Sequence, residues 1–123
     1  METILKLNTT DTVSGTLYST EAIEKMLDEC KDRSIYVTLG VGSGFDVPFD
    51  RIIGNVTKLF IEDSELKIDY MLYDTSAAHI LKGLQEEKVS VGFYPAMTAN
   101  VIDKEAKDIK LIHVHVDSEP AGT

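Results

Sequence analysis

Two short segments in the last third of the chain contain the residues that could do chemistry. Ser90 lies in the sequence Lys-Val-Ser-Val-Gly-Phe at Lys88–Phe93, and His113 and His115 alternate along the apolar run Leu111–Val116. A serine beside a glycine can be approached closely by a substrate, and a histidine on a neighbouring strand could take its proton within about 3 Å. These residues predict either a Ser90–His113 nucleophile and base, or an ordinary strand serine near hydrogen-bonded histidines.

The same two histidines are candidate ligands for a metal ion. Residues two apart on a strand point the same way, so His113 and His115 could bind one ion. Asp117 or Glu119 could add a carboxylate, but His79, the third histidine, falls on an expected helix. A complete site would need that helix to dock on the sheet at the right place. We therefore expect no metal and no cofactor, and keep the His113–His115 pair as an alternative.

Composition indicates one folded domain covering residues 1–123. The chain is 43% hydrophobic, and no apolar run approaches the roughly 20 residues that span a bilayer, so we expect no membrane partner and a cytosolic location. The net charge of −9 argues against nucleic acid and favours a basic protein surface as partner. Cys30, the single cysteine, is expected to be buried. The glycine-rich loop 40–44 lacks a following Gly-Lys-Ser/Thr, so we expect no nucleotide there.

The hydrophobic pattern predicts strands at 3–7, 13–18, 35–41, 52–61, 66–73, 89–97 and 109–116. Two helices are expected, one capped by Ser19 or Thr20 and one by Asp74 or Thr75. Their apolar stripes are Ile23, Met26, Leu27 and Cys30 in the first, and Ala77, Ile80, Leu81 and Leu84 in the second. Simple alternation in the last strand puts Ile109, Leu111, His113 and His115 on one face. The pattern predicts an α+β fold: a mostly antiparallel β-sheet or barrel with two packed helices.

Several short motifs, taken in order, resemble the prohead maturation proteases of tailed phages, which are relatives of the herpesvirus assemblins. The motifs are Tyr18–Ile23, Ile53–Val56 followed by Leu66–Asp69, Ile80–Leu84, Ser90–Phe93 (Ser-Val-Gly-Phe, similar to the family's Ser-Ile-Gly-Phe), and Leu111–Val116 with Pro120–Ala121. Together they cover most of the chain from residue 13 onward. The resemblance implies the protease-like fold of that family.

The resemblance also assigns roles to individual residues. Ser90 matches the family's nucleophile, and His113 falls where phage members usually place a triad carboxylate and the herpesvirus branch places a histidine. The family's general-base histidine should stand a few residues before Ile53, but Asp46–Ile52 contains none, and Val47 is the best match. Since general-base help is typically worth about 10²–10⁴-fold, this departure indicates a degenerate member without that base.

The expected function is therefore a phage virion or capsid-associated structural protein: a decoration, scaffold-associated or assembly component with a protease-like fold and without catalysis. Its partners would be a capsid or scaffold protein and further copies of itself as a homo-oligomer. It would act in the host cytoplasm during assembly and then in the virion. The alternatives are an active prohead maturation serine protease that uses Ser90 and His113, and a metal-binding β-barrel enzyme that uses His113 and His115.

Overall fold

The computed structural model describes residues 1–5, 16–40, 47–63 and 65–118, which form two α-helices, one 3-10 turn and six strands. In chain order the elements are β1 (Glu2–Ile4), α1 (Thr20–Cys30), β2 (Tyr36–Leu39), η1 (Phe49–Arg51), β3 (Ile52–Glu62), β4 (Glu65–Leu72), α2 (Ser76–Glu86), β5 (Val91–Ile102) and β6 (Glu105–Ser118). The predicted α+β class is confirmed. Neither described helix is long and apolar enough to cross a membrane.

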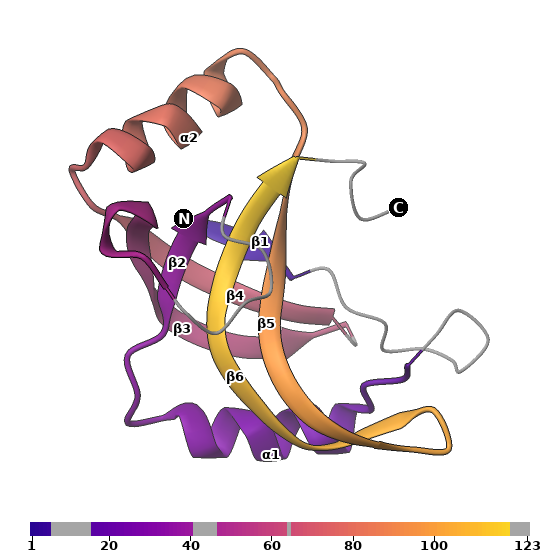
Figure 1. Ribbon diagram of the computed structural model, residues 1–123. Coiled ribbons are helices and arrows are strands. Elements are labelled where there is room, and N and C mark those ends of the chain that lie inside the picture. Colours follow the sequence, from indigo (N-terminus) through magenta and orange to yellow (C-terminus); the bar gives the residue numbers. More distant parts are fainter. Residues whose placement is uncertain (6–15, 41–46, 64, 119–123) are drawn as a thin grey trace.

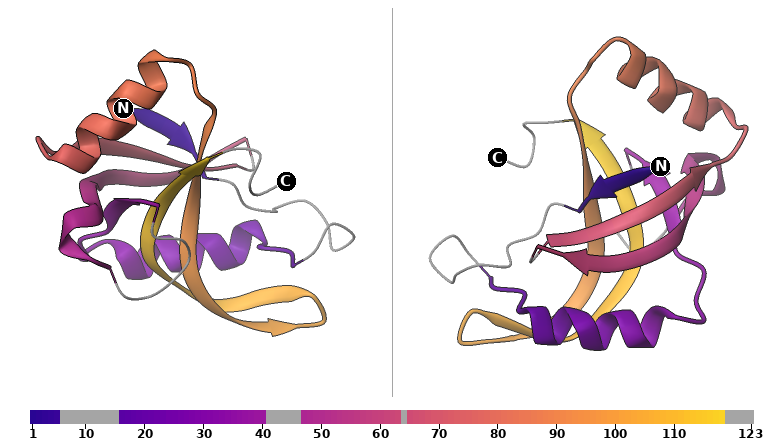
Figure 2. Two further views of the ribbon diagram at one scale, coloured as in Figure 1. Left: turned by 45° about the horizontal axis from the view of Figure 1, so that its top comes forward. Right: turned by 180° about the vertical axis from the view of Figure 1, so that it is seen from behind.

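The six strands form one curled sheet in the order β1-β4-β3-β2-β6-β5 (Figure 1). All neighbours are antiparallel except β2 and β6, which run parallel. The curl is strong enough for the two edges of the sheet to meet at one bridge, between Leu5 and Phe93. Helix α1 packs mainly against β6 and lies at one open end of the curled sheet. Helix α2 lies near β2 and β3, at the opposite open end (Figure 2). The result is a half-barrel closed at its ends by helices.

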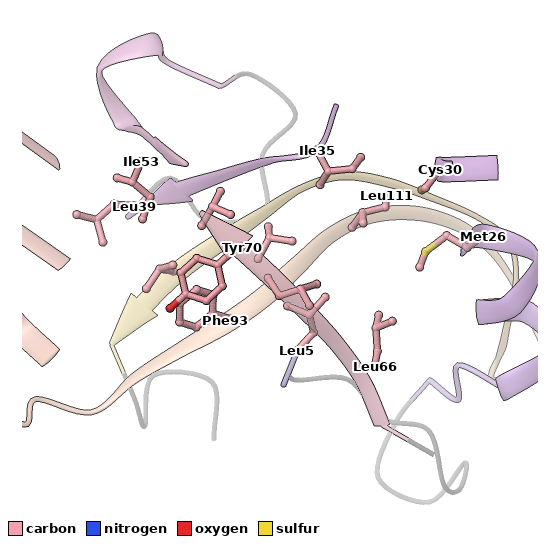
Figure 3. Close-up of a cluster of buried hydrophobic side chains, with 14 of the residues drawn as sticks. Leu5, Met26, Cys30, Ile35, Leu39, Ile53, Leu66, Tyr70, Phe93 and Leu111 are labelled. Atoms are coloured by element: carbon pink, nitrogen blue, oxygen red, sulfur yellow. The ribbon is translucent and has the colours of Figure 1, made fainter. Parts of the chain in front are cut away.

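The hydrophobic core fills the inside of this half-barrel. Figure 3 shows side chains from both helix and sheet converging there, among them Leu5, Met26, Ile53 and Phe93. The Tyr70 and Phe93 rings pack with their centroids 5.0 Å apart. In β4 the predicted alternation is confirmed, since Leu66, Ile68 and Tyr70 are buried. Cys30 is also buried as expected, and burial raises the pKa of its thiol despite the nearby Arg33 charge.

Both helices begin at residues that the sequence offers as caps. Each cap hydroxyl accepts a hydrogen bond from the backbone N–H three residues later in the chain. Ala22 donates to Ser19 at 3.2 Å, and Ala78 donates to Thr75 at 3.1 Å. The stripe of α1 faces the core as predicted. In α2 one member of the stripe is wrong, because Ile80 is 53% exposed and Ala78 is buried in its place. The small side chain of Ala78 lets α2 approach the sheet closely on that side.

The predicted two faces of the last strand are wrong at one point. The β5–β6 register shifts between Ala96 and Met97, which pair with His113 and Leu111, so Ile112 is an extra residue on β6. A bulge of this kind reverses the alternation beyond it. Leu111 therefore faces the core together with Val114 and Val116, and His113 and His115 share the other face.

The charged segment 100–108 forms the tip of the β5–β6 hairpin, which turns at Asp103 and Lys104. One other expected feature differs in the structure. The expected pairing of strands 3–7 and 13–18 is not seen in the described residues: Glu2–Ile4 pair with β4, and Leu17 bridges to Glu105. The remainder of those two segments lies outside the described residues.

Candidate functional site

Ser90 is held by the way that α2 ends. Lys88 adopts a left-handed conformation (φ 59°), and the N–H groups of Lys88 and Val89 donate to the carbonyls of Gln85 and Leu84. These two bonds form a Schellman motif, which turns the chain sharply out of the helix. Ser90 follows, immediately before β5, and it is exposed. Its hydroxyl makes no hydrogen bond within the described part of the chain.

The strand register shows which residues lie across from this serine. Val91 pairs with Ser118 and Gly92 with Asp117, whereas His113 pairs with Ala96. From Val91 to Ala96 the strand advances five residues, or roughly 17 Å. Proton transfer to a general base needs a hydrogen bond of about 3 Å. The register thus leaves Ser90 and His113 far outside that reach. The described β6 residues nearest to Ser90 are Ser118 and then Asp117, which pair with Val91 and Gly92.

Tyr94 occupies the surface between Ser90 and the nearer histidine. Its ring stacks on His115 with the centroids 5.3 Å apart and the planes 24° from parallel. The same ring lies over Gly92, since a Cβ atom at Gly92 would come within 2.6 to 2.8 Å of the phenol end of Tyr94. The absence of a side chain at Gly92 therefore makes room for Tyr94 rather than for an approaching substrate.

His113 is a fully buried residue with a partner of its own. Its exposure is 0%, and its Nδ1 lies 3.1 Å from the hydroxyl of Thr38, which is equally buried on β2. The tautomer of the imidazole decides which of the two groups donates. This contact ties β6 to its parallel neighbour β2. The arrangement is that of a hydrogen-bonded core histidine.

His115 lies beside it in a less polar setting. The two imidazole rings are 6.1 Å apart at their centroids, and His115 Nδ1 is buried without a hydrogen-bond partner in the described structure. Burial, and secondarily the charge of His113, lower the pKa of His115, while Asp117 acts in the opposite direction. His115 is thereby favoured in its neutral form. The described residues contain no cluster of three or more His, Cys, Asp or Glu side chains placed to hold a metal ion.

The remaining candidates for a base lie elsewhere. His79 Nε2 is 2.6 Å from Asp74 Oδ1 on the exposed first turn of α2. Seven helical residues, roughly 10 Å, separate it from Glu86 at the end of α2, and Ser90 follows that end in the chain. Val47, the position matched to the family's base, is half-buried, and residues 41–46 before it lie outside the described ranges. No described imidazole is thus placed to serve Ser90.

Two residues that shape this surface were missed in the sequence analysis. Thr38 sits in an otherwise apolar buried strand, and a polar residue there was a usable signal, because a buried hydroxyl needs a partner. Tyr94 stands two residues after Gly92, so the two share a face of β5. A glycine beside a large ring on one strand face suggests that the ring folds over it.

A groove lies between the two edge strands of the sheet, and it begins at Val91, the residue that follows Ser90. It has a volume of 430 Å³ and is lined by Glu2, Thr3 and Ile4 of β1, by Lys67, and by Val91–Phe93. In the described part of the chain, the two edges of the sheet are joined at the bridge between Leu5, which follows β1, and Phe93 of β5. Lys67 at its side is held by Glu62, with 2.8 Å between nitrogen and oxygen.

Comparison with solved structures finds the same fold in a phage protein. The capsid assembly protease of bacteriophage T4, gp21, superimposes with a TM-score of 0.79 over 94% of this chain and 79% of the T4 chain, at 11% sequence identity. No family model and no curated protein sequence matches the chain. This structural similarity confirms the predicted protease-like fold. At 11% sequence identity it shows the fold alone.

Proposed function

We propose that this protein is a phage capsid-assembly component that binds capsid or scaffold protein and does not cleave it. The fold is that of a capsid assembly protease. One observation supports the absence of catalysis most strongly: Ser90 stands immediately before β5, while His113 lies opposite Ala96, six residues further along the chain. A fold shared with an enzyme does not supply the enzyme's chemistry, which depends on the side chains at the site.

The surroundings of Ser90 also support this proposal. A serine with its ordinary acidity is a weak nucleophile and needs an adjacent base. Here the Ser90 hydroxyl has no hydrogen-bond partner in the described structure. Tyr94 and His115 form a stack in the space that a base would have to cross. Removing the Ser90 hydroxyl should therefore have no effect on whether the partner proteins are cleaved.

The groove beside Ser90 is the surface that would hold the partner. It lies between two strand edges, and an extended peptide can add to such an edge through backbone hydrogen bonds. Ile4 lines the groove and is 40% exposed, so it offers an apolar contact at the rim. The partner segment would be an extended stretch of the capsid or scaffold protein, bound there and left intact.

Co-expression with the cognate capsid and scaffold proteins tests both parts of the proposal. The tagged chain is expected to copurify with one of them at full length, and the Ser90→Ala variant should do so equally well. Ile4→Glu should weaken the copurification at least tenfold. Met71→Glu is the matched control, because Met71 is 52% exposed on β4 and does not line the groove, and it should bind like the wild type.

The outcomes separate the rival functions. Cleavage of either partner that disappears with Ser90→Ala would establish the serine protease that uses Ser90, and would refute the proposal. Full-length partners that fail to copurify would refute the binding role. Stoichiometric Zn²⁺ or Fe²⁺ in chelator-free protein, lost in His113→Ala, would support the metal-binding alternative at His113 and His115.

A further inference from the structure

A second groove, at the C-terminal end of α1, is lined by positive charge. It lies between α1 and β3 and has a volume of 280 Å³. Its nine lining residues include Lys31, Arg33 and Lys58 and contain no Asp or Glu. Three other grooves of the described structure each have at least one carboxylate in their lining. In a chain with 21 acidic and 12 basic residues, a groove lined in this way favours an anionic ligand.

Two of the three cations have no carboxylate partner. Arg33 donates one N–H to the carbonyl oxygen of Leu111 at 2.8 Å, and its guanidinium makes no other hydrogen bond or ion pair within the described ranges. The Lys58 ammonium lies over the Phe60 ring, 5.0 Å from its centroid, and has no ion pair in the same ranges. A guanidinium has five N–H donors in a planar fork that fits a carboxylate. Arg33 and Lys58 can therefore bind an incoming carboxylate without losing an existing ion pair.

The third cation, Lys31, is already paired, but at the surface. Its ammonium is 2.6 Å from Asp28, both side chains are 72% exposed, and Asp32 also acts on it. Exposed pairs of this kind are weak, because water and salt screen the two charges. A carboxylate of a ligand can therefore take the place of Asp28 at little cost.

Positive charge prevails at the α1 wall of the groove. The thiol of Cys30 lines this wall, and burial is the main influence on its pKa, which it raises. Two charges act on the same thiol. Arg33 lowers its pKa, and this effect is larger than the opposite effect of Glu29. At physiological ionic strength charges more than about 8 Å away are largely screened, so the net charge of −9 is felt less here than the local cations.

The rest of the groove suits a peptide better than a small anion. Leu27 and Leu59 contribute partly buried apolar side chains from its two walls. In the described part of the chain, β2 pairs with β3 as far as Asn55, and the N–H of Val56 donates to the carbonyl of Ile35. Beyond this point no described strand pairs with that edge of β3. An extended peptide can add to such an edge through backbone hydrogen bonds.

We propose that this groove binds a short acidic peptide segment of a partner protein, with one apolar side chain among its carboxylates. The carboxylates contact Arg33 and Lys58, the apolar side chain lies between Leu27 and Leu59, and the backbone follows the free edge of β3. The site shares no lining residue with the groove beside Ser90. It is independent of whether Ser90 is catalytic.

Fluorescence anisotropy with a fluorescein-labelled peptide, Ser-Asp-Glu-Leu-Glu-Asp-Ser, tests the proposal. The purified chain is expected to bind it saturably, with a dissociation constant of about 100 μM or lower. Arg33→Glu should raise this constant at least tenfold. Arg51→Glu is the matched control, because it changes the net charge equally at an exposed residue that does not line the groove. It should change the constant by less than about twofold.

A second pair of variants does not depend on the bond between Arg33 and Leu111. Lys58→Glu should also raise the dissociation constant at least tenfold, whereas Lys82→Glu, at an exposed position of α2, should not. Peptides with the carboxylates replaced by amides, or with the leucine replaced by serine, should each bind at least tenfold more weakly. Four results would overturn the proposal: no saturable binding to the wild type, equal effects of a groove variant and its control, equally tight binding of an altered peptide, or displacement of the peptide by an oligothymidylate of equal charge.

Discussion

Replacing Gly54 by alanine should destabilise the protein strongly, although it adds one methyl group. Gly54 lies in β3 opposite Leu72 of β4, and it is buried. A Cβ atom at this position would overlap the carbonyl oxygen of Met71 and would lie 3.0 Å from the Met71 carbonyl carbon and 3.1 Å from Leu72 Cα. All three atoms belong to the backbone. The two strands would have to separate, because no side chain can rotate out of the way.

Gly83 provides the matched control, since a Cβ atom there would meet nothing within 4 Å. Gly83 lies inside α2, where alanine is favoured over glycine by about 1 kcal/mol. Overpacking a core costs about 1–3 kcal/mol, and we expect about 3 kcal/mol at Gly54 because backbone must move. At about 4 °C per kcal/mol for a chain of this size, the melting temperature should fall by about 12 °C in Gly54→Ala and rise by about 4 °C in Gly83→Ala.

Thermal unfolding followed by circular dichroism measures both variants, and urea titration converts the shifts into free energies of unfolding. The opposite signs are the decisive feature. A Gly54→Ala protein that melts within 3 °C of the wild type would show that β3 and β4 are not in the contact described. A lower melting temperature in Gly83→Ala would show that the space around Gly83 is more crowded than described.

Three further predictions concern the elements around Ser90. Lys88→Gly should stabilise the fold by about 1 kcal/mol, because glycine adopts the left-handed conformation without strain; Lys82→Gly, inside α2, should cost about 1 kcal/mol, and equal effects in urea titration would contradict the Schellman motif. Thr38→Val should cost about 1–2 kcal/mol by removing the hydroxyl partner of His113, and an unchanged melting temperature would argue against that bond. The pKa of His115 is lowered in the folded state, so between pH 7.5 and 5.5 the unfolded chain takes up protons that the folded chain does not. The free energy of unfolding should therefore decrease as the pH falls from 7.5 to 5.5, and it should decrease less steeply in His115→Gln. A wild type whose free energy of unfolding does not change over this range would contradict this.

Local sequence signals predicted most of the fold correctly. The alternation of Leu66, Ile68 and Tyr70 identified β4, and the hydroxyls of Ser19 and Thr75 marked the helix starts, because these features depend on neighbours a few residues away. The protease-like arrangement was reached from the order of the motifs. It could not be reached from any single one of them.

The site was harder to predict, because it depends on the register between two long strands. That register is set by the turn at Asp103 and Lys104, where both residues have positive φ (50° and 66°). Two-residue turns of this kind usually contain Asn-Gly, so Asp-Lys gave a weak signal. The bulge at Ile112 then changed which residues share a face with the histidines. Neither feature follows from local composition, and together they separate Ser90 from His113.

The reactivity of Ser90 is the most direct test of the central claim that the fold has no working nucleophile. The purified protein is treated with a fluorophosphonate, which forms a covalent adduct with activated serines, and its intact mass is measured beside an active serine protease. No adduct is expected on Ser90 under conditions that label the control enzyme completely. A stoichiometric adduct that both Ser90→Ala and His113→Ala abolish would contradict the claim.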